Sequence, residues 1–314
     1  MTIFGKFQLG PQTGGRPPVA VELSPQGVLA AALPGRDQSP VYAFEPLAPG
    51  ALVPSIAEKN LLAPEAVAAA IHTALGQVPG RSHSITLVIP DTVVRVFILD
   101  FDSLPPRAAE ALPVLRFRLR KMIPFEVEHA GLSYQILTET KTECKVLAAV
   151  IPGSILQEYE GVVRMAGYEP GAVLPSSLAA IGAVDSEGPV MAANLSATTV
   201  TTTITDGQDL LLYRTLDLPD DPALRLDEVQ RGVAVAAAYY EDKLGVRPNL
   251  LYFAGIGAGI GTGRNSAAED FANWIEDSEL MVADLAPRPE TGAATPLSNL
   301  LTLAGVTGAL AGTN

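Results

Sequence analysis

VAVELSPQGVLAAAL, residues 19–33, is the stretch on which the fold depends, because two apolar runs flank Ser24-Pro25-Gln26 in it. Short apolar runs joined by turn residues predict a β-hairpin. A second series of strands is predicted at 190–195, 199–205 and 209–216, with Asp206-Gly207 as its first turn. Each series leads into helices and then another strand. This order of elements predicts an α/β protein with two similar halves.

Further elements follow from spacing in the first half. Pro64 begins a helix, and Gly76 ends it. ITLVIP (85–90) and VVRVFILDF (93–101) are strands of nearly continuous apolar character, which predicts burial on both faces. Later elements of this half are strands at 132–137 and 146–152, a helix with capping-box spacing at Ser154 and Gln157, and a short helix at 177–184.

The second half begins after DSEGP, residues 185–189, which reads as a domain boundary. Asp221-Pro222 supplies the N-cap and first residue of a long helix that runs to about Lys243, and Gly245 ends it. Strands at 249–255 and 280–285 follow, with a capping box at Ser266–Glu269 before another helix. The C-terminal stretch, with Asn299, threonines and glycines among its apolar residues, predicts a buried core helix.

Composition limits the possible functions of the 314 residues. A net charge of −13 argues against nonspecific nucleic-acid binding, and 48% hydrophobic residues argue against general disorder. The single cysteine, Cys144, lies in an apolar run, which predicts a buried inert thiol and a reducing compartment such as the cytosol. No signal peptide, membrane span or metal motif is predicted. Asp91, Asp100 and Asp102 flank strands and read as solvated loop carboxylates.

RFRLRKMIPFEVE, residues 116–128, concentrates cations and aromatics in this acidic chain. Helical spacing predicts one apolar seam of Leu112, Leu115, Leu119 and Met122, with Pro113 beginning or kinking the helix and Pro124 ending it. A second stripe contains Phe117. In the first interpretation, the arginines are solvated or paired with Glu110, Glu126 and Glu128. In the second, the arginines, Phe117 and Phe125 together bind a segment of another protein. Composition alone favours the first interpretation.

A family resemblance rests on three blocks: VIPDTVVRVFILDF (88–101), ALPVLRFRLRKMIPFEVE (111–128) and VLAAVIPGSILQEYEGVVRMAGYEPGAVLPSSLAAIGAV (146–184). Together they resemble the type IV pilus assembly protein PilM family, and LLTLAGVTGALAG (300–312) resembles the family's closing helix. The similarity is strongest over 85–184.

The resemblance implies an actin-like (ribonuclease H-like) two-domain fold. GPQTGGRPP predicts a flexible leader at 1–18, and the boundary at DSEGP divides the rest into a first domain at 19–184 and a second at 185–314. The resemblance adds a small inserted subdomain at about 91–150 in the first domain. It also implies a cytoplasmic scaffold, attached to the inner membrane through partners, that binds the N-terminal peptide of a PilN-like membrane protein in a groove of the first domain. Other pilus components and self-association are further expected contacts. The candidate groove residues are Arg116, Phe117, Arg120, Lys121 and Phe125.

Actin-like proteins hold ATP with Mg²⁺ between their domains. The corresponding positions here are Glu22 and Ser24 in the first hairpin, Asn194 and Ser196 in the second, and Gly255 and Gly257 in the glycine-rich turn. Serines replace phosphate-approaching glycines, Pro25 removes an N–H donor, and Asn194 replaces a metal-orienting carboxylate. Hydroxyls of Ser196, Thr198 and Thr199 remain as potential phosphate donors. The sequence thus predicts a non-enzymatic scaffold in which ordinary β-turns replace the phosphate hairpins.

Two alternatives stay open. One is an actin-fold enzyme that binds or hydrolyses ATP, which tight binding of Mg·ATP with turnover would identify. The other is the cytoplasmic domain of a protein related to GspL of type II secretion.

Overall fold

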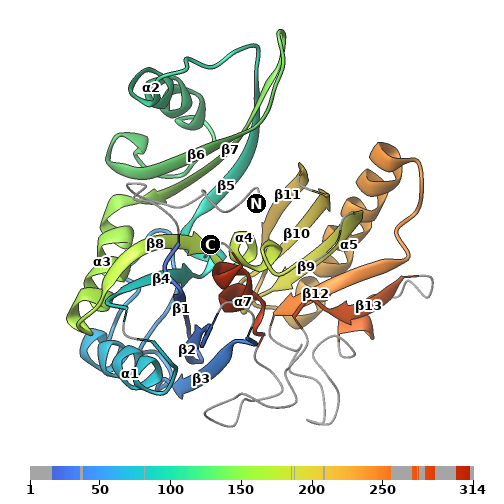
Figure 1. The fold of residues 1–314 in the computed structure, drawn as a ribbon. Coiled ribbons are helices and arrows are strands. Elements are labelled where there is room, and N and C mark those ends of the chain that lie inside the picture. Colours follow the sequence, from blue (N-terminus) through green and yellow to red (C-terminus); the bar gives the residue numbers. More distant parts are fainter. Residues whose placement is uncertain are drawn as a thin grey trace.

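The computed structural model describes residues 16–35, 38–80, 82–184, 186, 188–207, 209–255, 271–273, 275, 280–286 and 302–311. These residues form two lobes, each built on a five-stranded sheet, and an insert with a three-stranded sheet (Figure 1). Of the predicted leader, residues 1–15 lie outside the described residues, whereas Arg16 is buried.

The first domain has the strand order β3-β2-β1-β4-β8. Strands β1, β2 and β3 form an antiparallel meander, while β4 and β8 run parallel to β1. Helices α1 and α3 pack on the outer side of the sheet, and α4 and α7 lie between the two lobes (Figure 1). The elements are β1 (Val19–Ser24), β2 (Gly27–Ala32), β3 (Val41–Pro46), β4 (Ser84–Ile89), β8 (Glu169–Pro175), α1 (Pro64–Gly76), α3 (Gly153–Met165), α4 (Ser176–Ile181) and α7 (Ala304–Leu310).

The second domain repeats this topology. Its order is β11-β10-β9-β12-β13, again an antiparallel meander followed by two strands parallel to the first. The two similar halves predicted from element order are therefore confirmed. The elements are β9 (Pro189–Leu195), β10 (Thr199–Asp206), β11 (Asp209–Asp217), α5 (Pro222–Leu244), β12 (Leu250–Gly255) and β13 (Met281–Asp284).

The insert leaves the first domain after β4 through the short helix η2 (Asp91–Val93) and returns through β7 into α3. Its sheet has the order β5-β7-β6, and α2 packs on it around Ala111, Leu115 and Leu119. Cys144 is buried in this core, as the sequence predicts. The elements are β5 (Arg95–Phe101), α2 (Ala108–Leu119), η3 (Val127–His129), β6 (Ala130–Glu139) and β7 (Cys144–Pro152).

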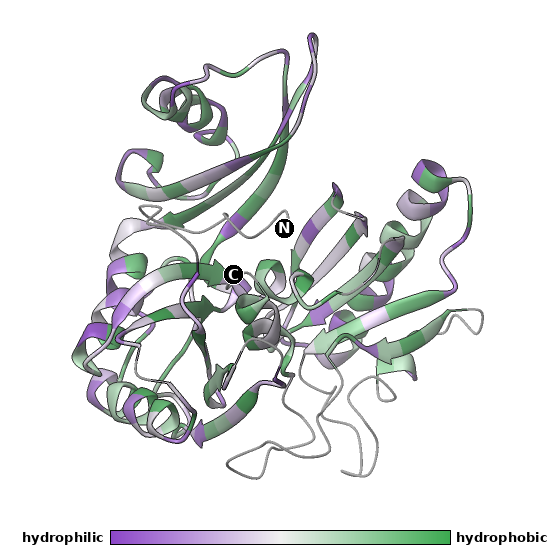
Figure 2. Ribbon diagram, in the orientation of Figure 1, coloured by the Kyte–Doolittle hydropathy of each residue, from purple (hydrophilic) through white to green (hydrophobic). Residues whose placement is uncertain are grey.

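Local sequence explains several elements. The Asp221 carboxylate caps α5 by accepting from the N–H groups of Ala223 and Leu224, and Gly245 ends the helix with a positive φ of 71°, both as predicted. Hydrophobic residues are frequent along the strands of the first-domain sheet (Figure 2), and its buried ones form one core with residues of α1, α3 and α7. None of the helices in the described part of the chain combines the length and hydropathy needed to cross a bilayer.

Three predictions of local structure are wrong. No side chain caps α3, which begins at Gly153 after Pro152, so the capping box at Ser154 is not formed. The sequence predicts burial of 93–101 on both faces, but strand β5 is mostly half-buried because it is an edge strand of the insert. Helix α2 begins five residues before Pro113 and ends at Leu119, so Met122 lies beyond the seam and is 43% exposed.

Candidate functional site

A small cavity lies between the two domains, beside the ends of their parallel strands. This is where open α/β sheets bind ligands. Of the predicted nucleotide-site residues, Glu22, Ser24, Asn194, Ser196 and Gly255 all line it. Gly257 lies outside the described residues. The tertiary structure thus gathers five positions that the sequence places in three separate segments.

Glu22 is half-buried on β1, and its Oε1 accepts a hydrogen bond of 2.6 Å from Ser176 Oγ. The other oxygen, Oε2, has no hydrogen-bond partner among the described residues. It packs against Gly305 of α7 so closely that a Cβ there would come within 2.4 Å. Burial is the main cause that raises the pKa of Glu22, to about 7.

The prediction that Asp91 is a solvated loop carboxylate is wrong, because only 4% of its surface is exposed. Helix η2 turns it beneath α4, where Ser177 donates from its backbone N–H (3.1 Å) and its Oγ (2.6 Å). Tyr213 of β11 donates its hydroxyl to the same carboxylate at 3.3 Å. Burial raises the pKa of Asp91 despite these donors.

Asn194 of β9 joins the second domain to α4. Its Nδ2 donates to Ser177 Oγ at 2.9 Å and to Ser176 Oγ at 3.4 Å. Each serine can accept from Asn194 while donating to a carboxylate, so the polarities agree. We call this set the cleft network, and its members are Glu22, Asp91, Ser176, Ser177, Asn194 and Tyr213.

In the second hairpin, a side chain of the hairpin itself accepts hydrogen bonds from the backbone N–H groups. Ser196 Oγ accepts from the N–H groups of Thr198 (3.2 Å) and Thr199 (2.9 Å), which are donors of the kind that a phosphate needs. The Thr198 hydroxyl bonds Thr92 Oγ1 across the domains at 2.6 Å, and the Thr199 hydroxyl bonds Ser196 Oγ at 2.8 Å. All three candidate phosphate donors are therefore engaged internally.

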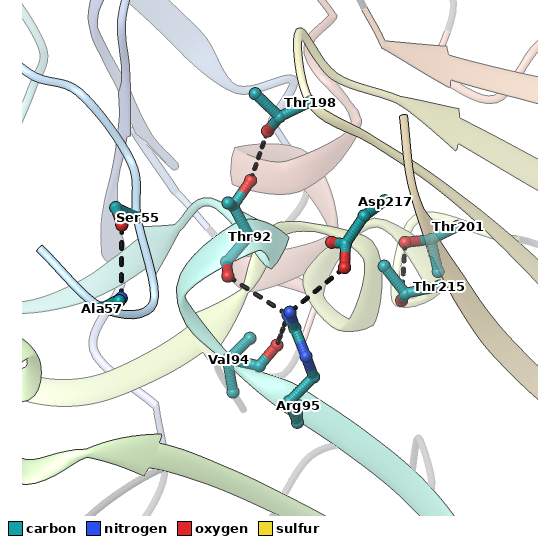
Figure 3. Close-up of polar contacts among 9 residues, drawn as sticks. All are labelled: Ser55, Ala57, Thr92, Val94, Arg95, Thr198, Thr201, Thr215 and Asp217. Atoms are coloured by element: carbon teal, nitrogen blue, oxygen red, sulfur yellow. Dashed lines mark hydrogen bonds and ion pairs between the residues drawn. The ribbon is translucent and has the colours of Figure 1, made fainter. Parts of the chain in front are cut away.

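A second cross-domain contact lies beside Thr92. Arg95, at the start of β5, forms an ion pair of 3.3 Å with Asp217 at the end of β11 (Figure 3). The same guanidinium donates to the carbonyls of Thr92 and Val94. The segment that opens the insert is thus tied to the second domain.

The described lining does not fit a magnesium nucleotide. The cavity measures about 90 Å³, whereas small-molecule sites measure roughly 300–1,000 Å³. Two carboxyl groups, those of Glu22 and Asp91, line it, and none of its described lining residues is Lys, Arg or His. The described residues also contain no group of three or more His, Cys, Asp or Glu side chains able to hold a metal ion.

A larger groove of about 450 Å³ separates the insert from the first domain. Its lining residues come from three segments: Ile56, Ala57, Glu58 and Lys59; Pro124 and Phe125; and Pro152, Ser154, Ile155 and Glu158. Sequence patterns gave no signal for the first and third segments, because they become neighbours only when the insert folds back.

The five candidate partner residues separate in the structure. Phe125 lines the groove, whereas Phe117 is 74% exposed on α2 and does not line it. Arg116 donates to the carbonyls of Val127 and Ala130, which fixes η3 against α2. Arg120 pairs with Glu128. Lys121 is exposed just after α2.

The sequence matches no protein-family model and no curated protein. Among solved structures, the chain is similar to the PilM–PilN type IV pilus biogenesis complex, with a TM-score of 0.63 and 16% identity over 85% of this chain and 88% of that one. It also matches the cytoplasmic domain of EpsL, an inner-membrane component of the type II secretion system of Vibrio cholerae (TM-score 0.47, 14% identity, 76% and 81% covered). The first likeness and the two matching sheets show an actin-like two-domain fold.

Proposed function

We propose that this protein is a cytoplasmic scaffold of a type IV pilus assembly complex at the inner membrane, and that it binds the N-terminal cytoplasmic peptide of a PilN-like membrane protein. The observation that carries the proposal is the groove between the insert and the first domain. It occurs in a fold similar to that of a chain from a PilM–PilN complex.

The chemistry of the groove suits a peptide. Ile56, Pro124, Phe125, Pro152 and Ile155 give it an apolar lining, and its volume falls in the range of ligand sites. Of the candidate residues, Phe125 supplies the aromatic surface of this groove. Phe117 and Lys121 remain proposed contacts for another component or for a second copy of the chain.

The proposal includes no catalytic step. The cleft network occupies the position where an actin-like enzyme would hold ATP with Mg²⁺. In the second hairpin, Ser196 Oγ already accepts the backbone N–H groups that would otherwise donate to a phosphate. The cavity beside it is also much smaller than a nucleotide site. These observations favour a scaffold over the alternative of an ATP-hydrolysing enzyme.

Calorimetry with a synthetic peptide from the N-terminus of the cognate PilN-like protein tests the proposal. We expect micromolar binding that weakens about tenfold or more in Phe125→Ala, since truncating a buried aromatic contact costs over 1 kcal/mol. Phe117→Ala is the matched control, because Phe117 does not line the groove. Absence of binding to the wild-type protein refutes the proposed function. Equal loss in both variants refutes the assignment to this groove.

A further inference from the structure

The loop that forms one wall of the groove is organised around a single buried amide. Asn60 has 0% of its surface exposed. Its Nδ2 donates to the carbonyls of Ser55 (2.8 Å) and Glu58 (2.7 Å), and its Oδ1 accepts from the N–H of Ser55 at 2.9 Å. The amide therefore closes residues 55–60 into a compact turn.

Helix α3 holds this turn in place. Glu158 Oε2 accepts from the N–H groups of Asn60 (2.9 Å) and Leu61 (3.2 Å), and the Tyr159 hydroxyl donates to Asn60 Oδ1 at 3.2 Å. A carboxylate that accepts two backbone N–H groups makes strong charge-assisted bonds. Two adjacent residues of α3 thus fix a loop that lies about a hundred positions earlier in the sequence.

The same elements form the groove. Residues 56–59 line it on one side, and Glu158 and Ile155 line it from α3, while Phe125 lies on the insert. Any change in the position of the 55–60 turn relative to α3 must change the shape of the groove. Asn60 and Glu158 do not have to touch a peptide strongly in order to control its binding.

We propose that Asn60 and Glu158 are positioning residues which hold the groove ready for an extended apolar peptide segment. This inference rests on the proposed function and adds the residues that set its specificity. A wall fixed in advance spares the loop from being ordered on binding, which favours affinity. Ordering a free loop would cost rotamer and backbone freedom with each binding event.

The charges of the groove indicate the class of peptide. Glu58 and Lys59 are adjacent and opposite in sign, and Glu158, which also lines the groove, already has its Oε2 bonded to two backbone N–H groups. Pro124 and Pro152 contribute no N–H donor. The groove therefore selects apolar side chains and gives little preference for net charge.

Two variants test the inference. Glu158→Gln keeps the shape of the side chain and removes its charge, and Asn60→Asp keeps the Oδ1 acceptor while placing an oxygen against two carbonyls. We expect faster amide hydrogen exchange at residues 55–61 in both variants, and peptide binding weakened about tenfold, or about 1.4 kcal/mol. Glu160→Gln is the matched control, since Glu160 lies on α3 but pairs with Arg164.

A saturating peptide should slow amide exchange at 55–61 by a larger factor in Glu158→Gln than in the wild type, because in the variant binding must order a loop that the wild type already holds in place. Between about 0.05 and 0.5 M NaCl we expect the wild-type affinity to change less than about threefold, because screening acts on net charge. Wild-type affinity in both variants overturns the inference while leaving the proposed function intact. A wild-type protein that binds no peptide overturns both.

Discussion

Replacing Glu22 by Gln tests whether the cleft holds an uncompensated buried carboxyl. Ser176 is the only described donor to Glu22, and Oε2 has no described hydrogen-bond partner. Burial and, secondarily, the nearby Asp91 raise the pKa from 4.5 to about 7. Since each pKa unit corresponds to about 1.4 kcal/mol, ionising Glu22 in the folded protein costs on the order of 3 kcal/mol relative to the unfolded chain.

The sign follows from proton binding. Between pH 4.5 and about 7 the folded protein retains a proton on Glu22 that the unfolded chain has released, so the free energy of unfolding falls as the pH rises through this window. Above about pH 7 the full cost is present. Glu22→Gln has no such proton, so its free energy of unfolding should fall less between pH 5 and pH 8, by up to about 3 kcal/mol.

Urea denaturation of both proteins at pH 5 and pH 8 gives the four free energies needed. Asp91, whose pKa is also raised by burial, remains in both proteins; because its charge repels that of Glu22, its pKa is raised less in Glu22→Gln, which adds to the expected difference in the same direction. Glu126→Gln serves as control, because Glu126 is exposed. If wild type and Glu22→Gln lose equal stability between the two pH values, the reasoning about an unpaired buried carboxyl is wrong.

Three further variants examine the packing of α7 on β1 and of α2 on the insert. Gly305→Ala should lower the free energy of unfolding by about 1–3 kcal/mol, because its Cβ would lie 2.4 Å from Glu22 Oε2 on a helix that cannot shift freely; a melting temperature equal to wild type would contradict the close packing of α7 on β1. Leu115→Ala should cost about 2–5 kcal/mol, since Leu115 is buried in the insert core. Phe117→Ser should change thermal stability by under about 0.5 kcal/mol because Phe117 is exposed. Equal losses in these two variants would show that α2 is oriented differently.

Local sequence patterns correctly predicted the helices, turns and caps that depend on residues close along the chain. The hairpin at 19–33, the helix from Pro64 and the caps Asp221 and Gly245 follow from turn chemistry and periodicity, and all are present. The actin-like fold itself came from a resemblance over a few blocks. The apolar run around Cys144 also predicted its burial correctly.

Local patterns failed at Asp91, which segments distant in the sequence bury, and at one end each of α3 and α2. Asp91 reads as a loop acid, yet α4 and Tyr213, 86 and 122 positions away, bury it. Ser154 has capping-box spacing, but α3 begins one residue earlier. Met122 continues the helical period, but α2 has already ended.

The sequence by itself determined that two hairpin-led halves form and which faces of their helices are apolar, because turn preference and hydrophobic period act between residues close along the chain. Only the tertiary structure decided that the cleft is bridged by Asn194 and Asp91, and that Asn60 and Glu158 shape a groove beside Phe125. Those contacts join residues roughly a hundred positions apart, and their hydrogen bonds depend on how the lobes and the insert pack.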